Sequence, residues 1–248
     1  MSRRIRLGVF GVGAAAVAVL LSLAIFGLPH FGQHHHPYRT AAVKAAIEHR
    51  SANVVSAVNF DSRGLDTLGE ETILLGSVVG VAALLRVSHD EVESHPSGGG
   101  RVLESTGLVG VVAIGVTVVL GFDVVAHGHL TPGGGFQGGV VLASGFHLLY
   151  VAGRYQSLER LRPVVAFEVA EAAGAVTFAS IGIVGLIASG SFLTNFLGWG
   201  TFGDLFSAGT VPVLNIAVGA EVASGVIILL TRFLEQDMSV GIRGGASA

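Results

Sequence analysis

The run HGHLTPGGGFQGG, residues 127–139, joins two long apolar segments and determines how the second half of this chain folds. A helix cannot continue through Pro132 followed by three glycines, because proline lacks an amide proton and clashes with the preceding turn. The run therefore predicts that one helix ends and another begins here, at or near a membrane boundary. Two uses of the break are open. Its free backbone groups point into a protein-lined site, or its glycines only permit tight packing, which is the interpretation we prefer.

The composition outside this run is typical of a membrane protein. Hydrophobic residues make up 51% of the 248 residues and charged residues 12%, and the mean hydropathy is +0.70. Several stretches of about 20 residues are almost free of charge, which is the length that crosses the hydrocarbon core. We expect an all-α, polytopic integral membrane protein with about six transmembrane helices. The predicted spans are 7–28, 67–85, 106–126, 138–152, 164–189 and 211–231.

The first apolar segment and the orientation of the chain are read from charge. Three arginines precede the segment, which is either an uncleaved anchor, as we expect, or a signal peptide. With a cytoplasmic N-terminus, ten of the 14 basic residues lie on the inside and four, Arg39, Lys44, Arg50 and Arg63, on the outside. This count follows the positive-inside rule. It predicts a multi-pass protein of the cell membrane with both termini in the cytoplasm and the loop at 127–139 outside.

Several classes of function are disfavoured by what the chain lacks. It has no cysteine, which excludes disulfides and thiolate metal sites. Its basic residues are scattered, so we expect no nucleic-acid partner. We find no nucleophile, phosphate-loop or zinc-protease motif and expect neither an enzyme nor a cofactor. His127 and His129 are two ligands at most, and His34-His35-His36 is more typical of a solvated loop, so no metal site is predicted.

The chain divides into two membrane modules in the sequence. Residues 89–103 are polar and rich in Gly, Ser and Pro, which is typical of a linker. We expect an N-terminal module at 1–88, a four-helix membrane domain at 104–236 and a cytoplasmic tail at 237–248. Between the first two spans, the segment 40–60 places apolar residues among polar ones, which predicts a surface or partner-packed helix.

Both modules resemble parts of one known assembly. The loop residues Gly128, His129, Pro132, Gly133, Gly134, Gly135, Phe136, Gly138 and Gly139 resemble the loop of the B subunit (MnhB domain) of Mrp-type multisubunit Na⁺/H⁺ antiporters. The run NFDSRGLDTLGE at 59–70 resembles a segment near the C-terminus of the large A subunit of the same antiporters, and a small subunit of membrane-bound hydrogenases. This single polypeptide thus resembles parts of two neighbouring subunits of one complex, joined in one chain.

The resemblance implies a function that this chain exercises only with partners. It implies a subunit of a cation/proton antiporter, assembled with other subunits in the bilayer, with Na⁺ as the expected cation. Such a subunit helps assemble the membrane arm and contributes to the Na⁺ or H⁺ pathway. Two alternatives stay open: a membrane-arm subunit of a redox-driven ion pump related to membrane-bound hydrogenase, and a purely structural scaffold.

Ionisable groups inside predicted spans are candidates for an ion pathway, because each is costly there without a partner. They are Asp66, Glu70, Glu71, His147, Glu168, Glu171 and Glu221. Glu221, near the middle of the last span, is the sharpest candidate for a proton carrier. Each also has an ordinary explanation: a hydrogen-bonded carboxyl at Glu221, acids near a helix start at Glu168 and Glu171, a helix cap near Asp66 and Glu70, and a hydrogen-bonded buried histidine at His147. Asp123 is expected to pair with His127 one turn later.

Overall fold

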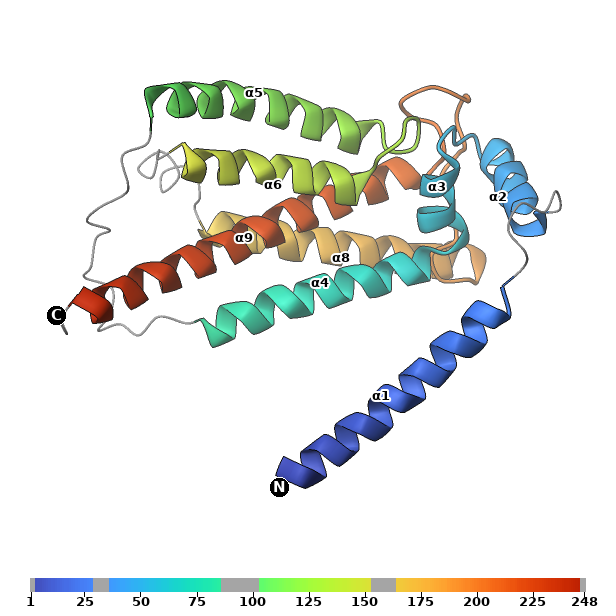
Figure 1. Ribbon diagram of the computed structural model, residues 1–248. Helices are drawn as coiled ribbons and strands as arrows, with labels where there is room; N and C mark the ends of the chain where they lie inside the picture. Colours follow the sequence, from blue (N-terminus) through green and yellow to red (C-terminus); the bar gives the residue numbers. More distant parts are fainter. Residues whose placement is uncertain (1–2, 29–35, 86–102, 153–163, 246–248) are drawn as a thin grey trace. The chain divides into compact units, whose positions relative to one another are not determined.

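The computed structural model describes residues 3–28, 36–85, 103–152 and 164–245, and within these ranges it is helical and contains no strand (Figure 1). The chain forms two compact units, Met1–Thr40 and Ala41–Ala248. The first contains α1 (Arg3–Phe26), whose described side chains are all exposed. A 24-residue helix that is apolar all round is typical of a membrane span.

The second unit is a bundle built around its last helix. It contains α4 (Gly64–Leu84), α5 (Glu104–Ala126), α6 (Gly135–Val151), α8 (Val164–Ser189) and α9 (Val211–Gly245). In Figure 1, α5, α6, α9 and α8 follow one another across the bundle, with α4 beside α8 and α9. α9 packs against all four of the others. Its apolar window is 61% buried against 17–22% for α4, α5 and α8, which makes α9 the central helix.

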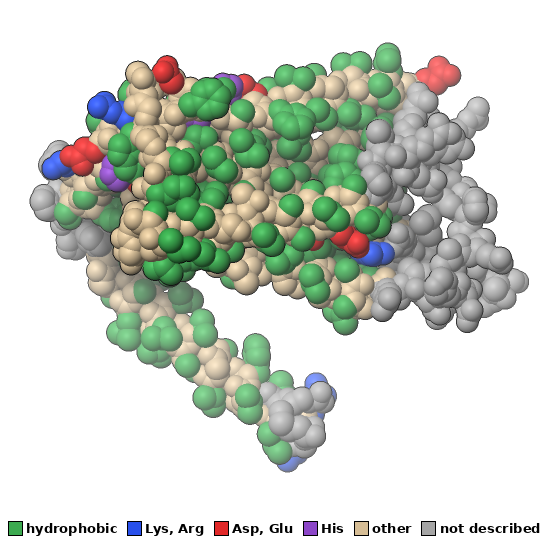
Figure 2. Space-filling view, turned by 180° about the vertical axis from the view of Figure 1, so that it is seen from behind, with side chains coloured by type: hydrophobic (Ala, Val, Ile, Leu, Met, Phe, Trp, Pro, Cys, Tyr) green, Lys and Arg blue, Asp and Glu red, His purple; other side chains and the backbone are tan. Residues whose placement is uncertain are grey.

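The apolar core lies where α4, α8 and α9 meet the loop between α8 and α9. Phe60, Phe178, Leu193, Leu214 and Val218 belong to one cluster of buried side chains. Leu193 comes from that loop, so the loop end of the bundle is closed by its own chain. Outside the core many large hydrophobic side chains are exposed, and Figure 2 shows that the charged side chains on one face lie near the ends of the helices.

The all-α, multi-pass fold is confirmed. Five described helices are long and apolar enough to cross a membrane: α1, α4, α5, α8 and the Val211–Leu234 part of α9. The remaining predicted span corresponds to α6, whose 17 residues extend about 25 Å. The predicted span 164–189 coincides with α8. The chain after 237, predicted as a tail, continues α9 as far as Gly245.

The two-module division stays a prediction. Residues 89–102 of the expected linker lie outside the described ranges. α4, from the first predicted module, packs against α8 and α9 of the second within one unit.

The expectation of one helix over 40–60 is wrong. The segment contains α2 (Pro37–Glu48), α3 (Val54–Ala57) and the π-helical turn η1 (Val58–Ser62). Arg50 adopts a φ of 61°, which ends the first helix, and Asn53 is extended and accepts from the amides of Val55 and Ser56 to begin the second. The apolar pattern runs through both helices, and it does not indicate that Asn53 binds a distant part of the chain.

Candidate functional site: a buried carboxyl cluster

Three carboxyl groups from three helices meet inside the bundle. Glu71 of α4, Glu171 of α8 and Glu221 of α9 are 1%, 4% and 0% exposed. The Glu71 and Glu221 carboxyls are close enough to share a hydrogen bond when one is protonated, and Glu171 interacts electrostatically with Glu221. Glu221 is therefore the middle member of this carboxyl cluster, which is defined as Glu71, Glu171 and Glu221.

No basic side chain, amide or hydroxyl of the described residues donates to the cluster. Both oxygens of Glu71, both of Glu221 and Oε1 of Glu171 lack such a donor. A buried carboxylate is normally stabilised by an opposite charge or by several hydrogen bonds. Three ionised groups cannot share this apolar volume, so the cluster requires protons or a cation to balance its charge.

Two glycines make room for the cluster. A Cβ on Gly174 of α8 would lie 2.6 Å from the Ala217 carbonyl oxygen and 2.8 Å from the Glu221 Cβ. A Cβ on Gly225 of α9 would lie 3.0 Å from Oε1 of Glu171. The backbones thus approach closely, as small residues allow inside membranes. Glu171 meets α9 one turn after Glu221, about 6 Å along the helix, so the carboxyls form a short ladder.

The ladder suits protons better than a directly ligated metal ion. Within the described ranges, no three His, Asp or Glu side chains converge closely enough to hold a metal. Neighbouring carboxyls can pass a proton directly or through water, because each is both donor and acceptor when protonated. The local chemistry therefore favours a proton relay over a cation cage.

The other candidate residues lie outside the ladder. Asp66 is exposed and pairs with Arg63, and Glu70 is exposed about 100° around α4 from the buried Glu71. Glu168 is half-exposed and lies 3.4 Å from Nη2 of Arg232, so it does not share the position of Glu171. His147 is exposed and its Nδ1 lies 3.1 Å from the Ala143 carbonyl oxygen.

The loop between α5 and α6 is held by an asparagine that the sequence did not single out. Nδ2 of Asn53 donates to the carbonyl oxygens of Gly128 (2.7 Å) and Thr131 (2.8 Å) and lies 3.3 Å from that of Gly133. The amide of Asn53 also donates to the carbonyl of His129 at 3.0 Å. The carbonyls freed by the break are thus bound within the chain.

A second asparagine fixes the start of α6. Oδ1 of Asn215, on α9, accepts from the amide of Gly135 at 2.8 Å, while its Nδ2 donates to Oγ of Ser56 (3.1 Å) and to the Val211 carbonyl (3.0 Å). Gly134, with a φ of 147°, makes the turn that brings Gly135 to this point. Both asparagines support the packing interpretation of the loop.

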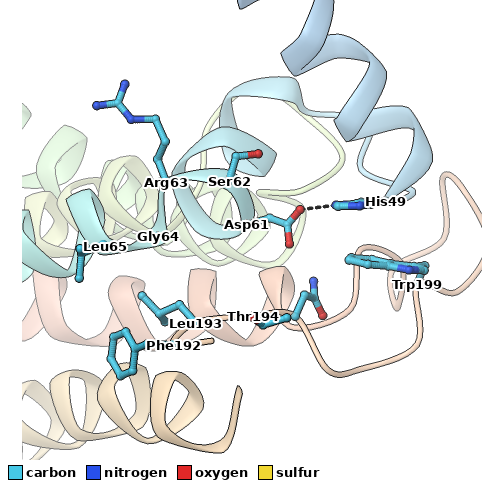
Figure 3. A pocket seen from close by; sticks show the side chains of 11 residues that line it. His49, Asp61, Ser62, Arg63, Gly64, Leu65, Phe192, Leu193, Thr194 and Trp199 are labelled. Carbon is cyan, nitrogen blue, oxygen red and sulfur yellow. Dashed lines mark hydrogen bonds and ion pairs between the residues drawn. The ribbon is translucent and has the colours of Figure 1, made fainter. Parts of the chain in front are cut away.

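A pocket of about 490 Å³, lined by both polar and apolar side chains, opens at the same end of the bundle (Figure 3). Asp61 and His49 point towards each other and form a hydrogen bond, and Trp199 stacks on His49 with ring centroids 4.0 Å apart. Arg63 points away from Asp61. These contacts join the α2–α4 segment to the loop between α8 and α9. The expected pair of Asp123 and His127 also forms, with Oδ1 and Nδ1 3.0 Å apart.

His129 lies fully buried within this loop assembly. Its Nε2 is 3.4 Å from the Asp204 carbonyl oxygen, and its Nδ1 has no partner among the described residues. Burial lowers the pKa of His129 below its ordinary value, and the nearby His127 acts in the same direction, while the Asp204 carbonyl opposes both. The imidazole is therefore neutral in the folded loop at physiological pH.

This burial predicts a loss of stability in acid. Below about pH 6.5 the imidazole of His129 is protonated in the unfolded chain but not in the folded loop. The free energy of unfolding is therefore highest above this pH and decreases as the pH falls below it. We expect the apparent Tm of the detergent-solubilised protein to decrease between pH 8 and pH 5, followed by fluorescence of the single tryptophan, Trp199. His129→Gln should flatten this dependence. The exposed control His147→Gln should retain it, and an unchanged slope in His129→Gln would contradict the assignment.

Comparison with known proteins places this architecture in a family. Residues 106–228, which contain the loop at 127–139, Glu171 and Glu221, match the model of a domain related to the MnhB subunit of the Na⁺/H⁺ antiporter. An uncharacterized protein of Methanocaldococcus jannaschii, MJ1307, is 30% identical over 84% of this chain and 88% of its own length. Residues 106–228 form a domain of the MnhB-related family. The resemblance of its loop to the MnhB domain is confirmed.

Other MnhB-related and structurally similar proteins are parts of large complexes. A probable K⁺/H⁺ antiporter A/B subunit of Rhizobium meliloti is 30% identical over 64% of this chain, which spans only 18% of that protein. A chain of the membrane-bound sulfane sulfur reductase, an archaeal respiratory membrane complex, has a TM-score of 0.67 and 27% identity, with 93% of this chain and 98% of that chain covered. A chain of the Mrp complex from Dietzia sp. DQ12-45-1b shares the fold, with a TM-score of 0.63, 23% identity and coverage of 94% and 26%.

Proposed function

We propose that this protein is a membrane-embedded subunit of an Mrp-type monovalent cation/proton antiporter, and that Glu71, Glu221 and Glu171 form part of its proton pathway. The observation that carries the proposal is the ladder of three buried carboxyls without protein donors, inside an MnhB-related helical bundle. The relative from Rhizobium meliloti is a probable K⁺/H⁺ antiporter subunit. Na⁺ and K⁺ are therefore both tested as the exchanged cation.

The proposal extends to the N-terminal module and the orientation. The alignment with the A/B subunit covers 64% of the chain, more than the MnhB-related residues 106–228, which supports a contribution from both subunit types. The loops at 127–134 and 190–210, at one end of the bundle, contain no Lys or Arg. By the positive-inside rule this end lies outside the cell and both termini lie in the cytoplasm.

A second candidate is a membrane-arm subunit of a redox-driven ion pump. It is favoured by one observation: the chain of the archaeal respiratory complex corresponds to nearly the whole of this chain, whereas the antiporter relatives are several times longer. The carboxyl ladder serves protons equally well in either assembly, so the two differ in what drives the ions.

The experiment that tests the proposal isolates the complex through a tag on this chain and reconstitutes it in liposomes. For an antiporter, a Na⁺ or K⁺ gradient alone moves protons, read with a pH-sensitive dye inside the vesicle, and liposomes with this chain alone show no exchange. Copurified iron–sulfur subunits, with proton movement only after an electron donor is added, would replace the antiporter by the redox-driven pump. An intact complex that moves protons under neither condition would contradict both.

A further inference from the structure

One face of α4 differs from the other lipid-facing surfaces of the bundle. Asp66, Gly69, Glu70, Ile73, Gly76, Ser77 and Gly80 recur every three or four residues and form what we call the outer stripe. The opposite face of the helix buries Gly64, Thr67, Glu71 and Val78 against the rest of the chain. Apart from the half-buried Gly80, the outer stripe is exposed within the second unit, Ala41–Ala248.

The outer stripe contains a carboxylate at membrane depth. Glu70 lies on α4 directly before Glu71, which meets Glu221 ten residues into the 24-residue span of α9. Glu70 therefore lies at the depth of the buried ladder but on the outside of the bundle. No described residue forms an ion pair or side-chain hydrogen bond with its carboxylate. Such a group costs several kcal/mol in hydrocarbon, about 3 kcal/mol on insertion scales, unless protein covers it.

α5 shows what a lipid-facing side of this protein looks like. Its exposed residues include Leu108, Val112, Val116, Val119 and Phe122, and no charged residue lies between Glu104 and Asp123 at its two ends. Between Asp66 and Gly80 the outer stripe has one large apolar side chain, Ile73, which is 72% exposed, and Leu84, 85% exposed, continues the same face at the end of the helix. The contrast indicates that α4 faces protein where α5 faces lipid.

The small residues of the outer stripe fit an approaching helix. A Cβ placed on Gly69, Gly76 or Gly80 would meet no described atom of the bundle. These glycines are therefore not required by the packing of the bundle, although glycine weakens a helix by about 1 kcal/mol relative to alanine. Gly76 and Gly80 are four residues apart, the spacing that lets two transmembrane helices approach at backbone distance. Ser77 already donates to the Ile73 carbonyl, so it needs no partner.

We propose that the outer stripe of α4 binds a transmembrane helix of a different subunit, and that this helix places a Lys or Arg side chain against Glu70. The charge follows from complementarity, because the cluster behind Glu70 is acidic and receives no basic group from the described residues. The proposal rests on the chain being part of a multisubunit complex. It does not require the carboxyl ladder to carry ions, so assembly and transport are measured separately.

Two glycines provide a matched pair for the assembly test. Gly76 on the outer stripe and Gly115 on α5 both lie mid-helix, with open space around a Cβ. In the full complex, Gly76→Leu should lower the yield of other subunits copurified with this chain by about tenfold, since about 1.4 kcal/mol of lost contact has that effect. Gly115→Leu should leave the yield unchanged, and both variants should insert in the membrane at wild-type levels. Equal yields for Gly76→Leu and wild type would overturn the proposal.

The partner is identified by a photo-crosslinking amino acid placed at Ile73, with Val112, 63% exposed on α5, as control. The expected product joins position 73 to a span of another subunit that contains a Lys or Arg, and position 112 yields lipid adducts only. Glu70→Lys should lower assembly, and reversing the partner's basic residue to Glu should restore it. Crosslinks from position 73 to lipid, to a second copy of this chain, or to a span without a basic residue would each overturn the proposal.

Discussion

Glu221→Gln is expected to lower cation-dependent proton exchange strongly while leaving the complex assembled. Glutamine keeps the size of the side chain and its hydrogen-bonding ability, but it cannot release a proton. Because Glu221 interacts with both Glu71 and Glu171, the variant interrupts the ladder at its middle. We expect the rate to fall by about a hundredfold, the lower end of what a positioned proton-transfer group contributes. The measurement is the cation-dependent ΔpH in inverted membrane vesicles that contain the whole complex.

The matched control for this variant is Glu168→Gln. Glu168 lies on the same helix as Glu171 but is half-exposed and paired with Arg232. Its neutralisation should leave exchange near the wild-type rate, while Glu71→Gln should behave like Glu221→Gln. Native gels establish that each complex is intact. Normal exchange by an assembled Glu221→Gln complex would show that Glu221 only packs, and it would favour a structural scaffold.

Asn215→Ala is expected to lower the stability of the chain more than any other truncation in the loop assembly. Asn215 is fully buried, and its amide joins α9, the start of α6 and α3. Truncation leaves the amide of Gly135 and the hydroxyl of Ser56 without this partner. Each unsatisfied buried group costs about 1–3 kcal/mol, so we expect a total loss of about 3 kcal/mol. Thermal unfolding followed by Trp199 fluorescence, in detergent, measures the loss as a lower apparent Tm.

Two further variants separate lost hydrogen bonds from other effects. Asn215→Asp keeps an acceptor for the Gly135 amide but loses both donors, so it should also be destabilised. Asn59→Ala alters a half-buried asparagine whose side chain makes no hydrogen bond with the described residues, and its Tm should stay near the wild-type value. If Asn215→Ala unfolds at the same temperature as Asn59→Ala, the proposed role of Asn215 is incorrect.

The helices were predictable wherever apolar length determines them. The predicted 164–189 coincides with α8, because the segment between Pro163 and Gly190 is long and almost uniformly apolar. The end of α5 and the start of α6 followed from Pro132 and the glycines after it. Local sequence failed over 40–60, where the apolar pattern continues but the chain breaks between α2 and α3, and Asn53 at the break binds a loop 75 or more residues away. Such a contact leaves no periodic signal.

The site was partly predictable for a similar reason. The depth of Glu221 in its span is visible in the sequence, and so is the unfavourable position of each carboxyl. Which carboxyls meet depends on the faces that the helices turn towards α9. Glu168 and Glu171 differ by only about 60° around α8, yet one reaches Arg232 and the other reaches the cluster. Gly174 and Gly225 allow α8 and α9 to approach closely enough for Glu171 to reach the cluster. A glycine within an apolar segment of the sequence does not indicate which helix it will pack against.

The central position of α9 has a consequence for biosynthesis. α4, α5, α6 and α8 precede it in the chain and therefore leave the ribosome and enter the bilayer before the helix that packs against all of them exists. Until Asn215 is synthesised, the Gly135 amide lacks its acceptor, and the carboxyls of Glu71 and Glu171 stand without the helix that encloses them. The bundle thus closes only after α9 has entered the bilayer, and a nascent chain stalled before residue 211 presents its acidic helices to the insertion machinery in an unassembled state.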